Sequence, residues 1–209
     1  MTHPVFAGYR PLIAILRGVT PDESVTVLET LINAGIGLIE VPMNSPEPLA
    51  SIRAMTAAAR GRARVGAGTV LTAGEVGAVK AEGGQIIVSP NVDAAVIRAA
   101  KAAGLDSYPG VFTATEALAA IAAGADALKF FPADKLGPDG IKAIGAILPR
   151  GFPLLAVGGI SSANMGEYLR AGIAGFGIGT SLYVPGRNAE DVGKRAREMV
   201  AAYDAAAKG

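Results

Sequence analysis

Short apolar runs alternate with longer amphipathic segments along the whole chain. The runs are rich in Ile, Leu and Val and have the length of buried strands, whereas the segments between them repeat apolar residues at helical spacing. We therefore expect a strand followed by a helix, repeated along the chain. The eight expected strands lie near residues 11–16, 36–41, 64–67, 85–88, 105–108, 125–130, 153–157 and 174–178.

Glycine marks the end of several expected helices, directly before the next strand. Gly84, Gly104 and Gly124 are spaced 20 residues apart. Glycine is favoured there because it adopts the left-handed conformation that closes a helix. A period of about 20–25 residues is also typical of leucine-rich repeats, but the leucine and asparagine pattern of those repeats is missing.

Polar residues predict where several helices begin. Thr20 and Glu23 have the spacing of a capping box, with a proline between them at the first helical position. Asn188 is expected to start the last helix, and Ser161 or Ser162 to cap the helix before it.

Alternation of strands and helices implies a parallel sheet, and eight units without a long break favour closure into a barrel over an open, doubly wound sheet. The chain has 209 residues and shows no linker rich in proline, serine or charge. We therefore expect an α/β protein with one (β/α)8 TIM-barrel domain over residues 1–209, in which residues 1–10 are a short N-terminal extension.

Composition and charge exclude several kinds of partner. The net charge is +1 with no basic stripe, which argues against nucleic acid, and no apolar stretch is long enough to span a membrane. Cysteine is absent and His3, in an N-terminus expected to be frayed, is the single histidine, so a zinc site is not expected. We expect a mechanism without metal or other cofactor, in the cytoplasm, because no secretion signal is seen.

Lys129 is the most informative residue because it stands inside the apolar run 125–130. Lysine is rarely buried, and burial favours the neutral amine, which can attack a carbonyl to form a Schiff base. A lysine that reaches the surface from a strand end is the alternative. The two aromatic residues and the proline that follow it favour the catalytic interpretation.

Other reactive groups lie at strand ends, where the active site of such a barrel forms. Arg17 follows the first expected strand, Glu40 lies in the second and Thr69 follows the third. A lone buried carboxylate is costly, so we expect Glu40 to pair with Lys129. A pair of Glu40 with Lys129 would fit a structural role as well as a catalytic one. Arg17 could bind substrate or could simply be a solvated residue at a strand end.

Two glycine-rich segments follow the last two expected strands, at residues 157–162 and 175–181. Barrels often bind phosphate at this place through backbone N–H groups, and glycine lets the backbone approach the anion closely. Each segment alone fits a tight turn, but the two together, in this order, favour a phosphate site.

These motifs resemble the aldolases that cleave 2-keto-3-deoxy-6-phosphosugar acids, a class I family with a trimeric (β/α)8 barrel. The resemblance implies that Lys129 forms the Schiff base, that Glu40 is the general acid and base, and that Arg17 and Thr69 lie near the pyruvyl end. It also implies a homotrimer, with pyruvate and a phosphorylated sugar acid as ligands. The phosphate would be held around Gly158, Gly159, Gly179, Thr180 and Ser181. The motifs span residues 13–18, 40–46, 66–71, 89–91, 129–132 and 157–160.

Three positions separate two branches of this family. The gluconate branch usually has threonine before the glycine pair and arginine four residues after the glutamate, where this chain has Val157 and Asn44. Asn91 stands where that branch typically has glycine. The resemblance therefore favours the galactonate branch, with Arg17 as carboxylate anchor and the gluconate epimer as the alternative substrate.

Two other classes compete with an aldolase on the same barrel. A phosphosugar isomerase or epimerase would share the phosphate site, but such enzymes commonly use paired carboxylates, histidine or a metal, in which this chain is poor. A non-catalytic barrel that binds a phosphorylated metabolite ranks lowest, because the expected site residues are chemically complete.

Overall fold

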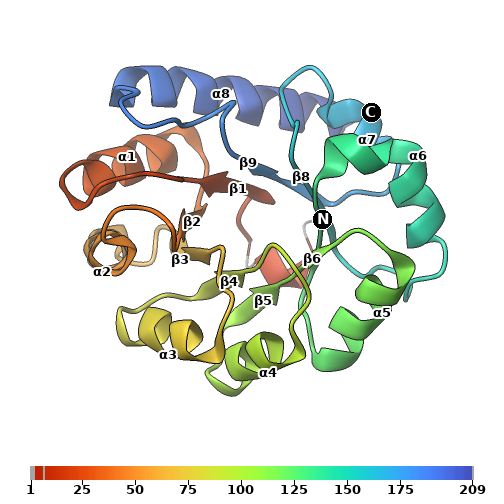
Figure 1. Cartoon of the computed structure of the whole chain (residues 1–209). Coiled ribbons are helices and arrows are strands. Elements are labelled where there is room, and N and C mark those ends of the chain that lie inside the picture. The colour runs from red at the N-terminus through yellow and green to blue at the C-terminus, as the bar shows by residue number, and fades with distance from the viewer. Residues whose placement is uncertain (1–2, 7, 209) are drawn as a thin grey trace.

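The computed structural model describes residues 3–6 and 8–208, which form a ring of parallel strands surrounded by helices (Figure 1). The barrel predicted from the alternating pattern is confirmed. The strands are β1 (Leu12–Ile15), β2 (Leu38–Pro42), β3 (Arg64–Gly68), β4 (Ile86–Val88), β5 (Asp106–Tyr108), β6 (Gly110–Val111), β7 (Leu128–Phe130), β8 (Leu154–Val157) and β9 (Gly175–Ile178). The helices are α1 (Pro21–Ala34), α2 (Pro48–Ala59), α3 (Ala73–Ala81), α4 (Ala94–Ala102), α5 (Ala114–Ala123), α6 (Ala133–Gly145), α7 (Met165–Arg170) and α8 (Ala189–Ala206).

The fifth expected strand is continued by a piece that the sequence did not predict. The strand order is β5-β4-β3-β2-β1-β9-β8-β7-β6, so β5 and β6 stand at its two ends although only Pro109 lies between them in the chain. Proline has no amide hydrogen and therefore interrupts the ladder of backbone hydrogen bonds. The nearly closed barrel thus has its seam at Pro109.

The sixth expected strand, near residues 125–130, is shorter than predicted and begins at Leu128 as β7. Asp126 explains the difference. Its carboxylate accepts hydrogen bonds from the Ser107 N–H (2.8 Å) and from Lys101 Nζ (2.7 Å). A side chain therefore satisfies the Ser107 donor at this end of the sheet.

The predicted helix starts are confirmed at two of three places. Glu23 Oε1 accepts from the Thr20 N–H (3.1 Å) before α1, and Asn188 Oδ1 accepts from the Asp191 N–H (2.8 Å) at the start of α8. The prediction that Ser161 or Ser162 caps the helix before α8 is wrong. Asn164 directly precedes α7, and its side chain does not cap the helix but bonds to the preceding loop, where its Oδ1 accepts from the Ser161 N–H (2.9 Å) and its Nδ2 donates to the Gly159 backbone oxygen (2.8 Å).

Alternation along the strands divides the core into two layers. Residues that point outward, such as Leu12 and Ala14, belong to the large cluster between sheet and helices. Residues that point inward fill the lower part of the barrel as a second cluster, which contains Ile13, Leu38 and Ala127. Side chains two positions further along a strand face the same side. The inward residues next in line are Ile15, Glu40 and Lys129, and they stand above this apolar layer.

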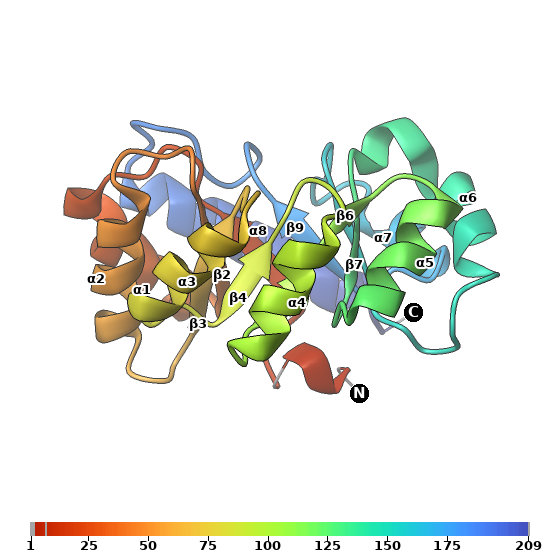
Figure 2. The same cartoon turned by 60° about the horizontal axis from the view of Figure 1, so that its bottom comes forward.

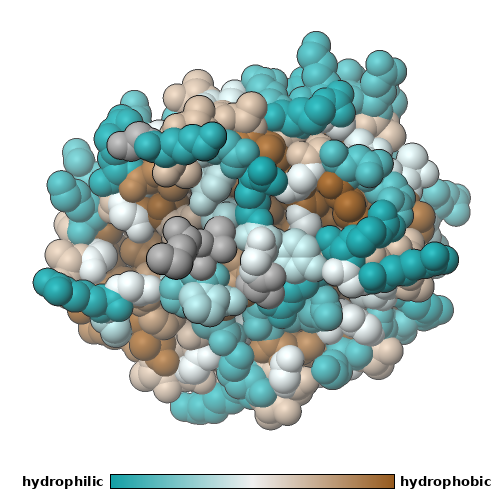
Figure 3. All heavy atoms as spheres, turned by 180° about the vertical axis from the view of Figure 1, so that it is seen from behind, coloured by the Kyte–Doolittle hydropathy of each residue, from teal (hydrophilic) through white to brown (hydrophobic). Residues whose placement is uncertain are grey.

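The N-terminal segment closes the lower end of the barrel. The 3-10 helix η1 (Pro4–Phe6) lies beneath the strands in Figure 2, and Phe6 is fully buried. The prediction of a frayed N-terminus around His3 is therefore wrong for this part of the chain. Hydrophilic side chains dominate the rim of this face, with apolar patches between them (Figure 3).

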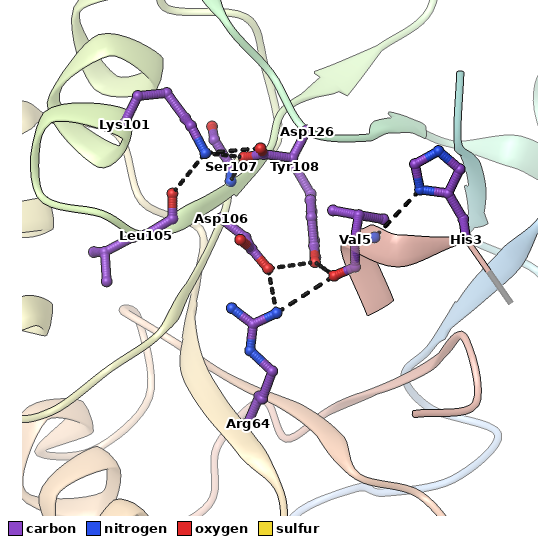
Figure 4. A network of polar contacts seen from close by, with 9 residues as sticks. All are labelled: His3, Val5, Arg64, Lys101, Leu105, Asp106, Ser107, Tyr108 and Asp126. Atoms are coloured by element: carbon purple, nitrogen blue, oxygen red, sulfur yellow. Dashed lines mark hydrogen bonds and ion pairs between the residues drawn. The ribbon is translucent and has the colours of Figure 1, made fainter. Parts of the chain in front are cut away.

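A polar network holds η1 against the barrel floor (Figure 4). Arg64 and Asp106 form an ion pair (Nη1–Oδ2 2.5 Å), and the Tyr108 hydroxyl donates to the same carboxylate (3.0 Å). Arg64 Nη1 also donates to the backbone oxygen of Val5 (3.3 Å). The floor is thus filled by apolar side chains and by polar groups that have partners.

Candidate active site

A cavity of about 220 Å³ opens at the carboxyl ends of the strands. This is the end at which barrel enzymes carry their active sites. Every residue predicted for the site from the sequence lines this cavity. They are Arg17, Glu40, Thr69, Lys129, Gly158, Gly159, Gly179, Thr180 and Ser181.

Lys129 occupies the middle of β7, between Gly110 of β6 and Leu155 of β8. Lys129 is only 6% exposed, which confirms the prediction that this lysine is buried. Burial lowers the pKa of Lys129, the charge of Glu40 opposes this shift and the charge of Arg17 adds to it. The ring of Phe131 lies beside the amine, with its centroid 4.8 Å from Nζ. The amine is thus biased towards the neutral form that acts as a nucleophile.

Glu40 projects from β2 into the same cavity and is 2% exposed. Burial raises its pKa to about 7, against the opposing charges of Lys129 and Arg17. The expected direct pair of Glu40 with Lys129 is not found. Within the described residues no ion pair joins the two side chains, and Glu40 Oε2 has no hydrogen-bond partner. A carboxyl group with this pKa can both accept and donate a proton near neutral pH.

Arg17 is held at the cavity mouth by two loops. Its Nη1 donates to Asn44 Oδ1, and its Nη2 donates to Thr69 Oγ1 (3.3 Å). Ser45 links the Asn44 loop to the loop that carries Arg17, since its Oγ accepts from the Gly18 N–H (2.9 Å). The guanidinium is exposed to the cavity and free to bind an anion such as a carboxylate. The sequence marks Asn44 only as a departure from one branch of the family and does not predict its contact with Arg17.

The two glycine-rich loops follow the neighbouring strands β8 and β9 and meet at the cavity. Ser181 Oγ donates to the backbone oxygen of Ile160 (2.7 Å), which ties the loop after β9 to the loop after β8. Gly159 has a φ of +70°, a conformation that favours glycine. Within the described part of the chain, the N–H groups of Gly159, Thr180 and Ser181 donate to no protein acceptor. Unpaired amides of this kind suit a phosphate group.

The cavity is also lined by Ile15, Phe131 and Pro90, to which the sequence assigns no role in the site. Phe131 stands two positions after Lys129, and residues at that spacing in a strand face the same side. Strand alternation could therefore have predicted its place. Pro90 follows the short strand β4, and no sequence pattern indicates that it reaches the cavity.

A larger hollow of about 930 Å³ lies at the opposite end of the barrel, between the N-terminal segment and α8. Two of its charged side chains, Arg10 and Asp204, are paired with each other (Nε–Oδ1 2.8 Å). It holds no buried lysine or carboxylate like those of the upper cavity.

Two observations restrict the remaining chemistry of the described residues. Their histidine, aspartate and glutamate side chains form no group of three that could hold a metal ion. None of their helices combines the length and the apolar character that a membrane crossing requires.

A buried lysine, a buried carboxyl group and an amide-lined loop pair at the upper end of a (β/α)8 barrel define the class I aldolase type of enzyme. The comparisons agree. The model of the family "Aldolase: KDPG and KHG aldolase" matches residues 8–196. The chain belongs to this KDPG and KHG aldolase family and is therefore a carbon–carbon lyase. An isomerase, an epimerase or a non-catalytic barrel is no longer supported.

Similar proteins include curated relatives from two bacteria. The chain is 53% identical over 196 residues to a "Probable 2-dehydro-3-deoxy-6-phosphogalactonate aldolase" of Rhizobium meliloti (strain 1021), covering 94% of this chain and 92% of the relative. It is 45% identical over 193 residues to "2-dehydro-3-deoxy-6-phosphogalactonate aldolase" of Escherichia coli (strain K12), covering 92% and 94%. A solved structure described as "Native KDPGal structure" has a TM-score of 0.94 at 44% identity, covering 95% of this chain and 97% of the other.

Proposed function

We propose that this enzyme cleaves 2-dehydro-3-deoxy-6-phosphogalactonate to pyruvate and D-glyceraldehyde 3-phosphate through a Schiff base on Lys129. The observation that carries the proposal is the burial of Lys129 (6% exposed) in one cavity with the buried Glu40. The names of the two bacterial relatives described above support the substrate.

The first half of the reaction joins the substrate to the enzyme. Neutral Lys129 Nζ attacks the C2 ketone and forms a carbinolamine, while Glu40 moves protons between the nitrogen and the former carbonyl oxygen. Loss of that oxygen as water gives a protonated imine. The pKa of about 7 lets Glu40 take up and return a proton in successive steps.

The second half breaks the carbon–carbon bond. Glu40 accepts the proton of the C4 hydroxyl, the electrons of the C3–C4 bond move into the protonated imine, and the C4 aldehyde leaves as D-glyceraldehyde 3-phosphate. The enamine that remains takes this proton from Glu40 at C3. Water then hydrolyses the imine, which releases pyruvate and restores Lys129 and Glu40.

The two ends of the substrate are bound by different parts of the cavity. Arg17, oriented by Asn44 and Thr69, binds the C1 carboxylate in a charge-assisted pair. The free N–H groups of Gly159 and Ser181 bind the phosphate at the opposite side. Fixing both ends places C2 beside the amine and favours the reactive geometry.

Val157 supports the galactonate substrate over its gluconate epimer. It lines the cavity and offers only methyl groups where a threonine would offer a hydroxyl. A comparison of kcat/KM for the two C4 epimers tests this choice. A higher kcat/KM for the gluconate epimer would contradict it.

The decisive experiment uses Lys129→Ala. We expect this variant to lose pyruvate release and to gain no mass when it is treated with borohydride and pyruvate, whereas the parent enzyme gains one reduced adduct. Glu40→Gln is the matched variant and is expected to slow turnover while Lys129 remains available for trapping. Near-normal activity of Lys129→Ala would contradict the mechanism.

We also propose a homotrimer that works in the cytoplasm. The family resemblance supports the trimer, and light scattering on the purified enzyme tests it. The charges of a phosphorylated sugar acid hinder its passage through a membrane, which supports action in the compartment where the substrate is made.

A further inference from the structure

The Glu40 carboxylate lies directly against the backbone of Gly68, the last residue of β3. Strands β2 and β3 pair in parallel, with Glu40 beside Gly66 and Pro42 beside Gly68. The Glu40 side chain therefore leans along the barrel, over the end of the neighbouring strand. A Cβ atom at Gly68 would lie 1.4 Å from Glu40 Oε2 and 2.2 Å from its Cδ. No side chain at position 68 is compatible with the carboxylate in this place.

Backbone conformation does not explain why position 68 is a glycine. Gly68 is not among the residues with positive φ, so its backbone is open to other amino acids. The three atoms nearest to an added Cβ all belong to the Glu40 carboxylate. At Gly66 and Gly110, in contrast, the nearest atoms are backbone oxygens of Ile86 and Pro90. Those two glycines permit close strand packing, whereas Gly68 makes room for a reactive group.

We propose that Gly68 is a positioning residue for proton transfer by Glu40. Without a side chain at position 68, the carboxylate can sit deep against β3 and stay clear of a direct ion pair with Lys129. The charged groups that act on it there are Lys129 and Arg17. This inference rests on the proposed function, because it assigns the position from which Glu40 serves the Schiff-base lysine.

Gly68→Ala tests the inference. The added methyl group pushes the carboxylate out of its place and towards the open cavity. We expect kcat to fall by about 100-fold, the size of a general acid–base contribution, with little change in KM. Borohydride should still trap pyruvate on Lys129. The inflection of the kcat–pH profile that belongs to Glu40 should move to lower pH, since a more exposed carboxyl group ionises more easily.

A second substitution provides a rescue that a merely structural role would not give. Aspartate is shorter than glutamate by one methylene, so Glu40→Asp leaves space for the methyl group at position 68. We expect the double variant Glu40→Asp/Gly68→Ala to have a kcat about tenfold above that of Gly68→Ala alone. Gly77→Ala is the matched control, because Gly77 lies on α3 with nothing within 4 Å of an added Cβ. It should leave kcat and the pH profile unchanged.

The outcomes separate this inference from the proposed function. If the parent enzyme releases pyruvate and Gly68→Ala keeps kcat within about twofold and the same pH profile, Gly68 does not position Glu40. Failure of both Gly68→Ala and the double variant to fold would also overturn the inference, because the carboxylate would then not be the obstacle. If Gly68→Ala alone fails to fold and the double variant is folded and active, the inference is supported. A parent enzyme that releases no pyruvate would overturn the proposed function itself.

Discussion

Glu40→Gln should make the enzyme more stable at neutral and alkaline pH while it slows catalysis. Glu40 is 2% exposed and its Oε2 has no partner, so the folded protein holds a carboxyl group that is costly to ionise. Burial raises the pKa of Glu40 from 4.5 to about 7, a net value that already includes attraction by Lys129 and Arg17. Glutamine has nearly the same shape and is never charged, so the variant avoids that cost.

The size and the sign of the effect follow from this pKa difference. Because the pKa of Glu40 is raised on folding, the folded state holds the proton more tightly than the unfolded state does. Glu40 therefore does not reduce the free energy of unfolding below pH 4.5, and it reduces this free energy progressively as the pH rises towards 7. Above that range the loss is constant at about 3 kcal/mol, from about 1.4 kcal/mol for each pKa unit. For a chain of this length, that difference corresponds to a Tm higher by roughly 6–12 °C in Glu40→Gln at pH 8.

The effect is measured as the Tm of thermal unfolding at pH 4 and at pH 8, monitored by circular dichroism or calorimetry. The parent enzyme and Glu40→Gln should have the same Tm at pH 4, and Glu40→Gln should have the higher Tm at pH 8. The exposed Glu190, in the first turn of α8, provides the control, and Glu190→Gln should not separate from the parent in this way. The reasoning is refuted if Glu40→Gln is no more stable at pH 8, or if its gain is equally large at pH 4.

Three further predictions concern the floor, the phosphate end and the domain. Asp106→Ala removes the partner of Arg64 and of the Tyr108 hydroxyl. Because the side chains of Arg64 and Asp106 are each only 19% exposed, we expect the free energy of unfolding, measured with urea, to fall by about 2 kcal/mol. Gly159→Ala places a methyl group 2.5 Å from the Cβ of Asp134 at a φ of +70°, so KM for the phosphorylated substrate should rise about tenfold while trapping of pyruvate persists. Residues 1–209 should unfold in one cooperative calorimetric transition, and two resolved transitions would contradict a single domain.

The sequence predicts the barrel well because each strand carries its own signal. Apolar runs of strand length alternate with amphipathic helices, and this local pattern needs no knowledge of tertiary contacts. The observed strands differ from the predicted ones where a single residue changes the backbone hydrogen bonding between strands. Pro109 interrupts the strand ladder between β5 and β6, and Asp126 takes a backbone donor that lies 19 residues away. Neither effect is visible in the hydropathy of the segment itself.

In the candidate site, too, the sequence predicts single residues but not the contacts that depend on the fold. Lys129 and Glu40 are predicted because a charged residue inside an apolar strand is conspicuous in the sequence. The contact of Arg17 with Asn44 is not predicted, since 27 residues separate them and only the folded barrel brings their loops together. The absence of a direct pair between Glu40 and Lys129 is likewise invisible in the sequence, because it depends on the space above Gly68.

Stability and chemistry therefore occupy different levels of the barrel interior. In the lower level, Phe6 and Tyr108 are fully buried, and Asp106 accepts from both Arg64 and Tyr108. Burial of each large apolar side chain there contributes about 1.5–3 kcal/mol, enough to offset the cost of the charge at Glu40. In the upper level the small Gly68 leaves space where a side chain could have packed, and the carboxylate that fills it lacks a partner. A partner for that carboxylate would stabilise the fold, but it would also lower the pKa on which proton transfer near neutral pH depends.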